Sequence, residues 1–136
     1  MITALDHIAI AVPDFEGAIK RFMEDFGLPF DGTEEVADAR TSTAFFPLPP
    51  TQIELVHPLN GEGPIADYLE KRGGGLHHLC FRSDNIVEDV ERLRAKGYRF
   101  LSDAPSPGAH GSQVIFIHPK SCDGVLIEIN QPGEDH

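Results

Sequence analysis

The sequence predicts an α+β fold in which two tandem βαβββ modules form a curved, cleft-like mixed sheet with the helices outside. Two observations support this fold class. The segments that start at His7 and His78 share one layout, in which a histidine opens an apolar strand and an amphipathic helix and a glycine turn follow. Both halves then end in a strand that contains Ile-Glu, at Glu54 and Glu128. A repeat of this kind indicates two copies of one supersecondary unit.

The length of the chain sets the expected domain organisation. With 136 residues, of which 40% are hydrophobic, the chain can bury one sizeable core. Each copy of the repeat, at roughly 70 residues, would be marginally stable alone, so the two copies are expected to share a sheet system. We therefore expect a single domain over residues 1–136, with a first module at about 4–57, a linker at 58–75 and a second module at about 76–131.

The first module is expected to contain a strand, a helix and three further strands. An apolar strand over residues 5–12 ends at Pro13, and Asp14 then caps a helix that closes at Gly27. The apolar residues of this helix recur with a period near 3.6 residues, which is typical of an amphipathic helix. Asp-Gly and Pro-Pro pairs, which favour turns, separate the strands that follow. These strands are expected at residues 29–36, 40–46 and 52–56.

The second module repeats this order after a short helix over residues 64–72 and a glycine connector. A strand is expected at residues 76–81, followed by a helix that Asp84 caps and that ends before Gly97. The inward positions of that helix are Ile86, Val90 and Leu93. The remaining strands are expected at residues 98–101, 114–118 and 125–130. The order contains no alternating βαβ run, so a parallel dinucleotide-binding sheet is not expected.

The charge and hydropathy of the chain exclude several classes of partner. The formal net charge is −11 and the sequence contains no basic run, which argues against nucleic acid or an anionic membrane surface as the partner. We expect no targeting leader, because no charged-then-apolar segment opens the chain, and no apolar run approaches the length that spans a membrane.

The two cysteines and two of the histidines are not expected to form a site. Cys80 and Cys122 are too few for a disulfide framework, so we expect two free thiols and a cytoplasmic location, where thiols stay reduced. His57 and His136 are expected to lie at the surface, because the first precedes a proline at a strand end and the second is terminal.

The histidine and glutamate of each repeat are candidate metal ligands. The separation is 47 residues from His7 to Glu54 and 50 residues from His78 to Glu128. His77 and His78 point to opposite faces of a strand, and the match to His7 selects His78. Singly, each histidine has a structural alternative, and each glutamate could lie on the wet side of an edge strand. Together, at equivalent positions of two modules, they indicate a divalent first-row metal ion with one side left open to water or substrate.

Several segments of the chain resemble the vicinal-oxygen-chelate superfamily, and within it the methylmalonyl-CoA epimerase family. These segments are LDHIAIAVPD, IELVHPLN, PIADYLEKRGGGLHHLCF and GAHGSQVIFIHPKSCDGVLIEIN, which together cover most of the chain. The resemblance implies that His7, Glu54, His78 and Glu128 bind one divalent ion per chain, with cobalt expected first and zinc, nickel and manganese as alternatives. It also implies an acyl-CoA thioester as substrate and a homodimer as the working assembly.

The activity implied is a metal-dependent isomerase that interconverts (R)- and (S)-methylmalonyl-CoA. The α-proton would leave one face of the carbon and return to the other, through an enolate that the metal stabilises. Glu128 is expected to be one base, since a carboxylate beside the metal can accept the proton. Some members of the family have a separate glutamate on the third strand of the first module, where this chain reads RTSTAFFPL. The second base is therefore either Glu54 or a water held by the hydroxyls of residues 41–43.

Other functions in the same superfamily are the alternatives. Glyoxalase I has the same set of two histidines and two glutamates and also moves a proton beside a carbonyl, so the ligands do not separate the two reactions. The segments GAHG and HPKSCDG favour the epimerase. A non-catalytic small-molecule-binding protein would often lose the ligands, and this chain retains all four. A dioxygenase would more typically have two histidines, one glutamate and a longer chain.

Overall fold

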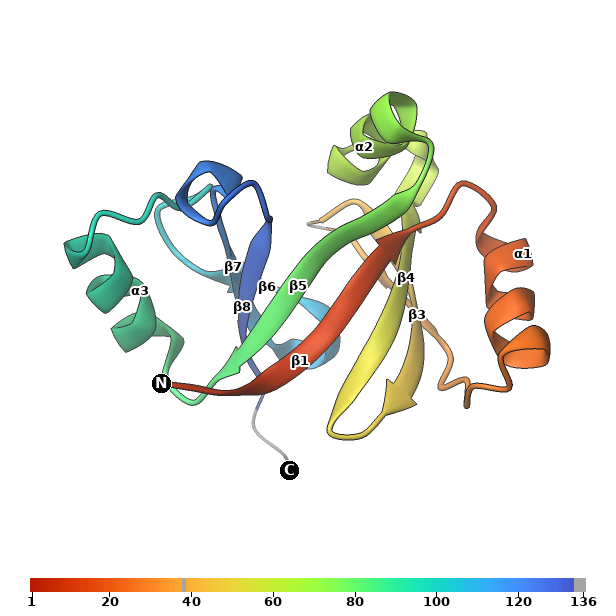
Figure 1. Ribbon diagram of the computed structural model, residues 1–136, viewed down its shortest axis with the longest axis horizontal. Helices are drawn as coiled ribbons and strands as arrows, with labels where there is room; N and C mark the ends of the chain where they lie inside the picture. Colours follow the sequence, from red (N-terminus) through yellow and green to blue (C-terminus); the bar gives the residue numbers. More distant parts are fainter. Residues whose placement is uncertain (38, 134–136) are drawn as a thin grey trace. The chain divides into compact units, whose positions relative to one another are not determined.

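The computed structural model describes residues 1–37 and 39–133 of the chain (Figure 1). These residues fall into two compact units. The first unit consists of residues 7–77, and the second unit consists of Met1–Asp6 together with the residues from His78 onward. Strand β1 (Ile2–Ala11) and strand β5 (Gly75–Ser83) each contribute residues to both units.

The first unit contains a four-stranded mixed sheet. Its strands follow the order β2-β3-β4-β1, with β2 at Thr33–Val36, β3 at Thr41–Leu48 and β4 at Thr51–Pro58. Strand β1 runs parallel to β4, whereas the β2–β3 and β3–β4 pairs are antiparallel. In this register Ala9 of β1 and Phe45 of β3 both lie opposite Glu54 of β4.

The second unit repeats this topology. Its strands follow the order β5-β8-β7-β6, with β6 at Ser106–Pro107, β7 at Gln113–Ile117 and β8 at Ile127–Gln131. Strand β5 runs parallel to β8, and the other two pairs are antiparallel. Cys80 of β5 and Phe116 of β7 both lie opposite Glu128 of β8. The predicted α+β class, with two βαβββ modules that each form a mixed sheet, is therefore confirmed.

Helix α1 (Phe15–Lys20) covers one face of the first unit's sheet. The carboxylate of Asp14 caps the helix by accepting a hydrogen bond of 3.0 Å from the backbone N–H of Gly17, as the sequence predicts. A π-helical turn over Arg21–Asp25 extends the helix, which ends before Gly27 at a φ of 68°. The buried residues of this core are Val12, Ala18, Ala44, Phe46 and Leu55.

Helix α3 (Ile86–Ala95) covers one face of the second unit's sheet in the same way. Ile86 and Val90 are buried against the core, and Leu93 packs beside them, as predicted. The predicted cap at Asp84 is wrong, because the side chain of Asn85 accepts the hydrogen bond from Glu88 N–H. Asparagine and aspartate cap helices about equally well, so the sequence does not decide between neighbouring candidates.

A buried carboxylate lies on the inner side of helix α3. Asp89 is 1% exposed and accepts hydrogen bonds from the hydroxyl of Ser83 and the guanidinium of Arg92. The N-terminal ammonium of Met1 lies 3.3 Å from the same carboxylate. Burial raises the pKa of Asp89, but the hydrogen bonds from Ser83, Arg92 and the ammonium outweigh burial and lower the pKa overall. The folded chain therefore stabilises the charged form of Asp89.

The edge of the second unit's sheet differs from the prediction. The prediction of a regular strand over residues 98–101 is wrong, because the structure has an isolated bridge there, between Phe100 and Ile117. The edge strand is instead the two-residue β6, which contains Pro107. Proline has no backbone N–H and is confined to edge positions in a sheet, so a short β6 is the strand that this segment can supply.

Helix α2 (Pro64–Arg72) lies between the two repeats in sequence and packs on the first unit (Figure 1). Its residues Ile65, Tyr68 and Leu69 contact a small cluster that includes Ala9 and Ala11. These alanines alternate along β1 with the residues that face α1, so α2 and α1 lie on opposite faces of this sheet. No helix among the described residues is long and apolar enough to cross a membrane.

The histidines expected at the surface have different outcomes. His57 is half-buried, its ring stacks on Phe15 at 5.6 Å, and its Nδ1 lies 2.8 Å from the carbonyl oxygen of Val12. The surface prediction for His57 is wrong because the first residue of α1 packs over the end of β4. His136 lies outside the described residues.

Candidate active site

The first unit brings together one of the two predicted His–Glu pairs. Ala9 lies opposite Glu54 in the parallel β1–β4 pair, and His7 points to the same face as Ala9 because strand side chains alternate. The Nδ1 atom of His7 lies 3.1 Å from Oε2 of Glu54. His7 is 4% exposed and Glu54 is 8% exposed, so both polar side chains are buried. Their face of the sheet is the one opposite helix α1.

The second unit brings together the other pair with the same register. Cys80 lies opposite Glu128 in the parallel β5–β8 pair, and His78 precedes Cys80 by two residues, as His7 precedes Ala9. The Nε2 atom of His78 lies 3.0 Å from Oε1 of Glu128. His78 and Glu128 are 9% and 7% exposed. The ring of Phe116 meets the His78 ring edge-on at 5.2 Å between centroids.

The buried carboxylates of Glu54 and Glu128 require partners that stabilise their negative charge. An ionised carboxylate is costly to bury unless it is paired or binds a metal ion. Each pair supplies one imidazole nitrogen and one carboxylate group, and these donor types suit a divalent first-row ion. Donors that lie about 2.0–2.2 Å from one ion are about 3 Å apart when they occupy neighbouring coordination positions. The separations of 3.1 and 3.0 Å within the pairs fit this arrangement.

Gln52 is a contact of the candidate site that the sequence analysis missed. Its Nε2 donates a hydrogen bond of 2.7 Å to Oε2 of Glu54, the same oxygen that lies beside His7. Gln52 precedes Glu54 by two residues on β4, so both side chains project from the same face. The period of two along a strand is the signal that could have identified Gln52.

His77 and His78 have different partners in the structure. His78 is directed to Glu128, whereas the ring of His77 packs edge-on against Tyr68 of α2 at 5.0 Å between centroids. The two neighbouring rings therefore have different partners, as the alternation of strand side chains predicts. The hydroxyl of Tyr68 donates to the carbonyl oxygen of Leu76 at 2.7 Å.

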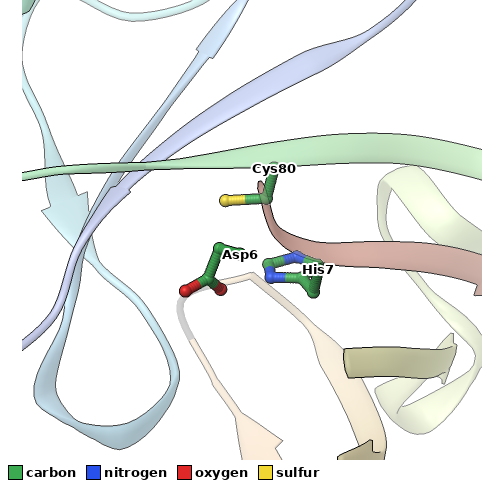
Figure 2. Close-up of side chains that lie close together, drawn as sticks. All are labelled: Asp6, His7 and Cys80. Carbon is green, nitrogen blue, oxygen red and sulfur yellow. The ribbon is translucent and has the colours of Figure 1, made fainter. Parts of the chain in front are cut away.

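Asp6 of β1 and Cys80 of β5 lie near each other in the second unit (Figure 2). A carboxylate oxygen of Asp6 and the sulfur of Cys80 lie within 4.8 Å of each other. Asp6 accepts a hydrogen bond of 2.9 Å from Nε of Arg82, which gives its charge a direct partner. Cys80 is fully buried, and neither it nor Cys122 forms a disulfide, as predicted.

The hydroxyls expected on β3 are not equivalent. Thr43 lies opposite Val56, so Thr41 and Thr43 project from the face that also holds Glu54, and both are buried. Ser42 projects from the other face, where helix α1 packs. The Thr41 hydroxyl donates to the carbonyl oxygen of Ala39 at 2.7 Å. Thr43 is therefore the hydroxyl of this strand that is best placed on the Glu54 face.

Comparison with known proteins identifies the class to which this fold and these residues belong. The family model described as Glyoxalase/Bleomycin resistance protein/Dioxygenase superfamily matches residues 6–116. The chain belongs to this superfamily. Among its relatives, the ethylmalonyl-CoA/methylmalonyl-CoA epimerase of Cereibacter sphaeroides is 42% identical over 133 residues, which are 96% of this chain and 99% of the relative. The predicted resemblance to the methylmalonyl-CoA epimerases is confirmed.

Solved structures give the same result. The methylmalonyl-CoA epimerase of Mycobacterium tuberculosis has a TM-score of 0.93 and 35% identity, over 98% of this chain and 90% of that one. A variant of the Streptomyces coelicolor methylmalonyl-CoA epimerase, in complex with 2-nitronate-propionyl-CoA, has a TM-score of 0.94 and 28% identity, over 98% and 100% of the two chains. A lactoylglutathione lyase of Arabidopsis thaliana is 25% identical, and this chain covers 44% of it. The epimerases are the more similar class.

Proposed function

We propose that the chain is an isomerase that interconverts (R)- and (S)-methylmalonyl-CoA, which it binds as an acyl-CoA thioester. The observation that supports this most directly is the equivalent His–Glu pair in each unit, at the same register of a parallel strand pair. The similarity to epimerases extends over nearly the whole chain, which includes both pairs. The lactoylglutathione lyase alternative has weaker support, since the lyase relative is less similar.

We further propose that His7, Glu54, His78 and Glu128 together bind one divalent ion per chain, with cobalt first and zinc, nickel and manganese as alternatives. The donor types and the His–Glu separation within each pair support this assignment. When bound, the ion supplies positive charge that stabilises the negative charge developing on the thioester oxygen. Removal of the ion should therefore abolish the activity, and addition of it should restore the activity.

Glu128 is proposed as one base of the reaction. Its carboxylate is buried against Phe116 and His78, where little water competes for the proton it accepts. The C–H bond at the α-carbon breaks, its electron pair moves toward the thioester carbonyl, and the proton passes to an oxygen of Glu128. The proton that returns comes from the opposite face of the carbon. That second group is either Glu54 or a water held by the hydroxyl of Thr43.

The test is exchange of the α-proton with solvent. The purified chain, loaded with Co²⁺, is mixed with a single stereoisomer of methylmalonyl-CoA in D₂O, and deuterium at the α-carbon and the ratio of isomers are measured by NMR and chiral analysis. Deuterium uptake with formation of the opposite isomer supports the epimerase. Turnover of the hemithioacetal of methylglyoxal and glutathione, without exchange on methylmalonyl-CoA, would assign the lyase instead. Tight binding without either reaction would assign a small-molecule-binding protein.

The assembly, location and domain organisation are part of the same proposal. We propose a homodimer, a cytoplasmic location and one domain over residues 1–136. Light scattering on the protein as it elutes from a gel-filtration column gives the mass of the assembly. A mass equal to that of one chain would reject the dimer. A single cooperative transition on unfolding, seen equally by probes in both units, supports one domain.

A further inference from the structure

The aromatic ring of Phe116 lies beside the carboxylate that is proposed as a base. Phe116 of β7 is directly opposite Glu128 of β8 in an antiparallel pair, so both side chains project from the same face of the second unit's sheet. The ring also meets the His78 ring edge-on, at 5.2 Å between centroids, and His78 is the residue that pairs with Glu128. An apolar surface therefore adjoins this His–Glu pair.

Phe116 is the neighbour of Glu128 whose apolar surface a substrate can reach. The other residue directly opposite Glu128 is Cys80, which is 0% exposed, whereas Phe116 is only half-buried. Residues directly opposite in an antiparallel pair have Cβ atoms about 4.5–5.5 Å apart. Leu126 and Asn130, two positions away along the chain, are farther, at about 6.6 Å between Cα atoms.

The first unit offers an internal comparison. Phe45 of β3 lies opposite Glu54 just as Phe116 lies opposite Glu128. Phe45 is 2% exposed, so its ring has almost no surface that a bound molecule could contact. The repeat thus places a phenylalanine beside each glutamate, but the ring in the second unit retains more accessible surface.

We propose that Phe116 determines the size of the α-alkyl group that the site accepts. This inference rests on the proposed function, because it takes Glu128 as a base. Proton transfer requires the reacting atoms to lie about 3–3.5 Å apart. The alkyl group is bonded to the same carbon as the proton, so it lies beside the carboxylate of Glu128, where the ring of Phe116 can contact it. In an apolar site of fixed size, one methylene more or less changes kcat/KM by about 10–200-fold.

Two substitutions shorten the apolar side chain in steps. Phe116→Leu keeps a branched apolar group, and Phe116→Ala removes most of the ring's volume. Phe45→Leu is the matched control, because it makes the same change at the equivalent position of the first unit, where the ring is buried. Circular dichroism and thermal unfolding establish that each full-length variant is folded, and Phe116→Leu carries the test if Phe116→Ala does not fold.

The measurement is a competition between two thioesters in one solution. Equal amounts of methylmalonyl-CoA and propylmalonyl-CoA are mixed in D₂O with the Co²⁺-loaded protein, and mass spectrometry follows deuterium uptake into each. The early uptake gives the ratio of the two kcat/KM values, whatever fraction of the protein is active. Phe116→Ala should shift this ratio toward the propyl substrate by about 10–200-fold relative to the wild type. Phe116→Leu should shift it less in the same direction, and Phe45→Leu should leave it unchanged.

A structural role for Phe116 would give a different result. If the ring acted only by packing against His78, its loss would slow both thioesters alike and leave their ratio unchanged. An unchanged ratio in both Phe116 variants, or an equal shift in Phe45→Leu, would overturn the inference. A wild type that does not exchange the α-proton of methylmalonyl-CoA would refute the proposed function, and the role of Phe116 with it. A wild type that does exchange it, beside Phe116 variants of unchanged ratio, refutes only the role of Phe116.

Discussion

Replacing Glu128 by glutamine tests the base and the ligand at the same position. Glu128 is 7% exposed, and its Oε1 lies 3.0 Å from Nε2 of His78. Glutamine has nearly the same size and shape, so the packing against Phe116 should persist. It retains one carbonyl oxygen that can bind a metal ion, but its amide does not accept a proton at neutral pH. Glu128→Gln therefore separates proton transfer from metal binding.

The substitution is expected to lower the rate of proton transfer by orders of magnitude but to change the metal affinity and the free energy of unfolding only modestly. Loss of a positioned base lowers the rate about 10²–10⁴-fold, which raises the barrier by about 2.7–5.5 kcal/mol. The metal affinity should fall modestly, since a neutral amide oxygen replaces a charged one. In the metal-free protein the contact with His78 becomes a neutral hydrogen bond, so the free energy of unfolding should change by only about 1 kcal/mol. The large effect should therefore appear in the chemical step alone.

The assay follows deuterium uptake at the α-carbon from each stereoisomer in a single turnover, at Co²⁺ concentrations that saturate the variant. Metal content and unfolding are measured on the same preparation. Exchange that stays within about tenfold of the wild type for both isomers would fall below the contribution of any positioned base and would refute the role of Glu128. Loss of the metal from Glu128→Gln, with exchange restored at high Co²⁺, would show that Glu128 is a ligand only.

Five further substitutions, of which Phe26→Ala is a control, test the other parts of the structure. Glu54→Gln should retain the metal and exchange both isomers, and loss of exchange with one isomer alone, with metal still bound, would show that Glu54 is the second base. His78→Ala should lose metal content and activity together, so full metal occupancy would refute its assignment as a ligand. Because the pKa of Asp89 is lowered in the folded chain, its charged form adds stability above about pH 4, and this contribution is lost as the pH falls through the lowered pKa. The wild type should therefore have a higher free energy of unfolding than Asp89→Asn near neutral pH, and this difference should disappear in acid. A difference that does not depend on pH would contradict this. Phe46→Ala, at a fully buried core position, should cost about 3–5 kcal/mol in urea unfolding, whereas Phe26→Ala at a 59% exposed position should cost far less.

The repeat made the fold and the two pairs predictable from the sequence. A strand places every second residue on one face, so the matching positions of His7 and Glu54 with His78 and Glu128 followed once the strands were aligned. The helix cap at Asp14 could also be predicted, because an aspartate directly precedes an amphipathic helix. That all four residues bind one ion stays a prediction.

Other features depend on contacts that no local pattern encodes. The edge strand of the second sheet is β6 and not residues 98–101, and this depends on which segment can pair with β7. His57 is half-buried because Phe15, 42 residues earlier in the chain, stacks on its ring. The contact between Gln52 and Glu54 could have been inferred as a shared face, but not as a hydrogen bond, because glutamine has several rotamers that point elsewhere.

Duplication of one module supplies equivalent groups, but an epimerase needs groups with different roles. A carbon that inverts presents its proton to one face and receives a proton on the other, so two positions must accept or donate in each direction. Identical modules would place identical carboxylates at both positions, with equal ability to bind an ion or to move a proton. The two modules differ beside the shared pair, since Gln52 donates a hydrogen bond to Glu54, whereas the matching position of the second module is Leu126, whose side chain has no donor. The roles of the two halves then follow from what each half adds around the shared pair rather than from the pair itself.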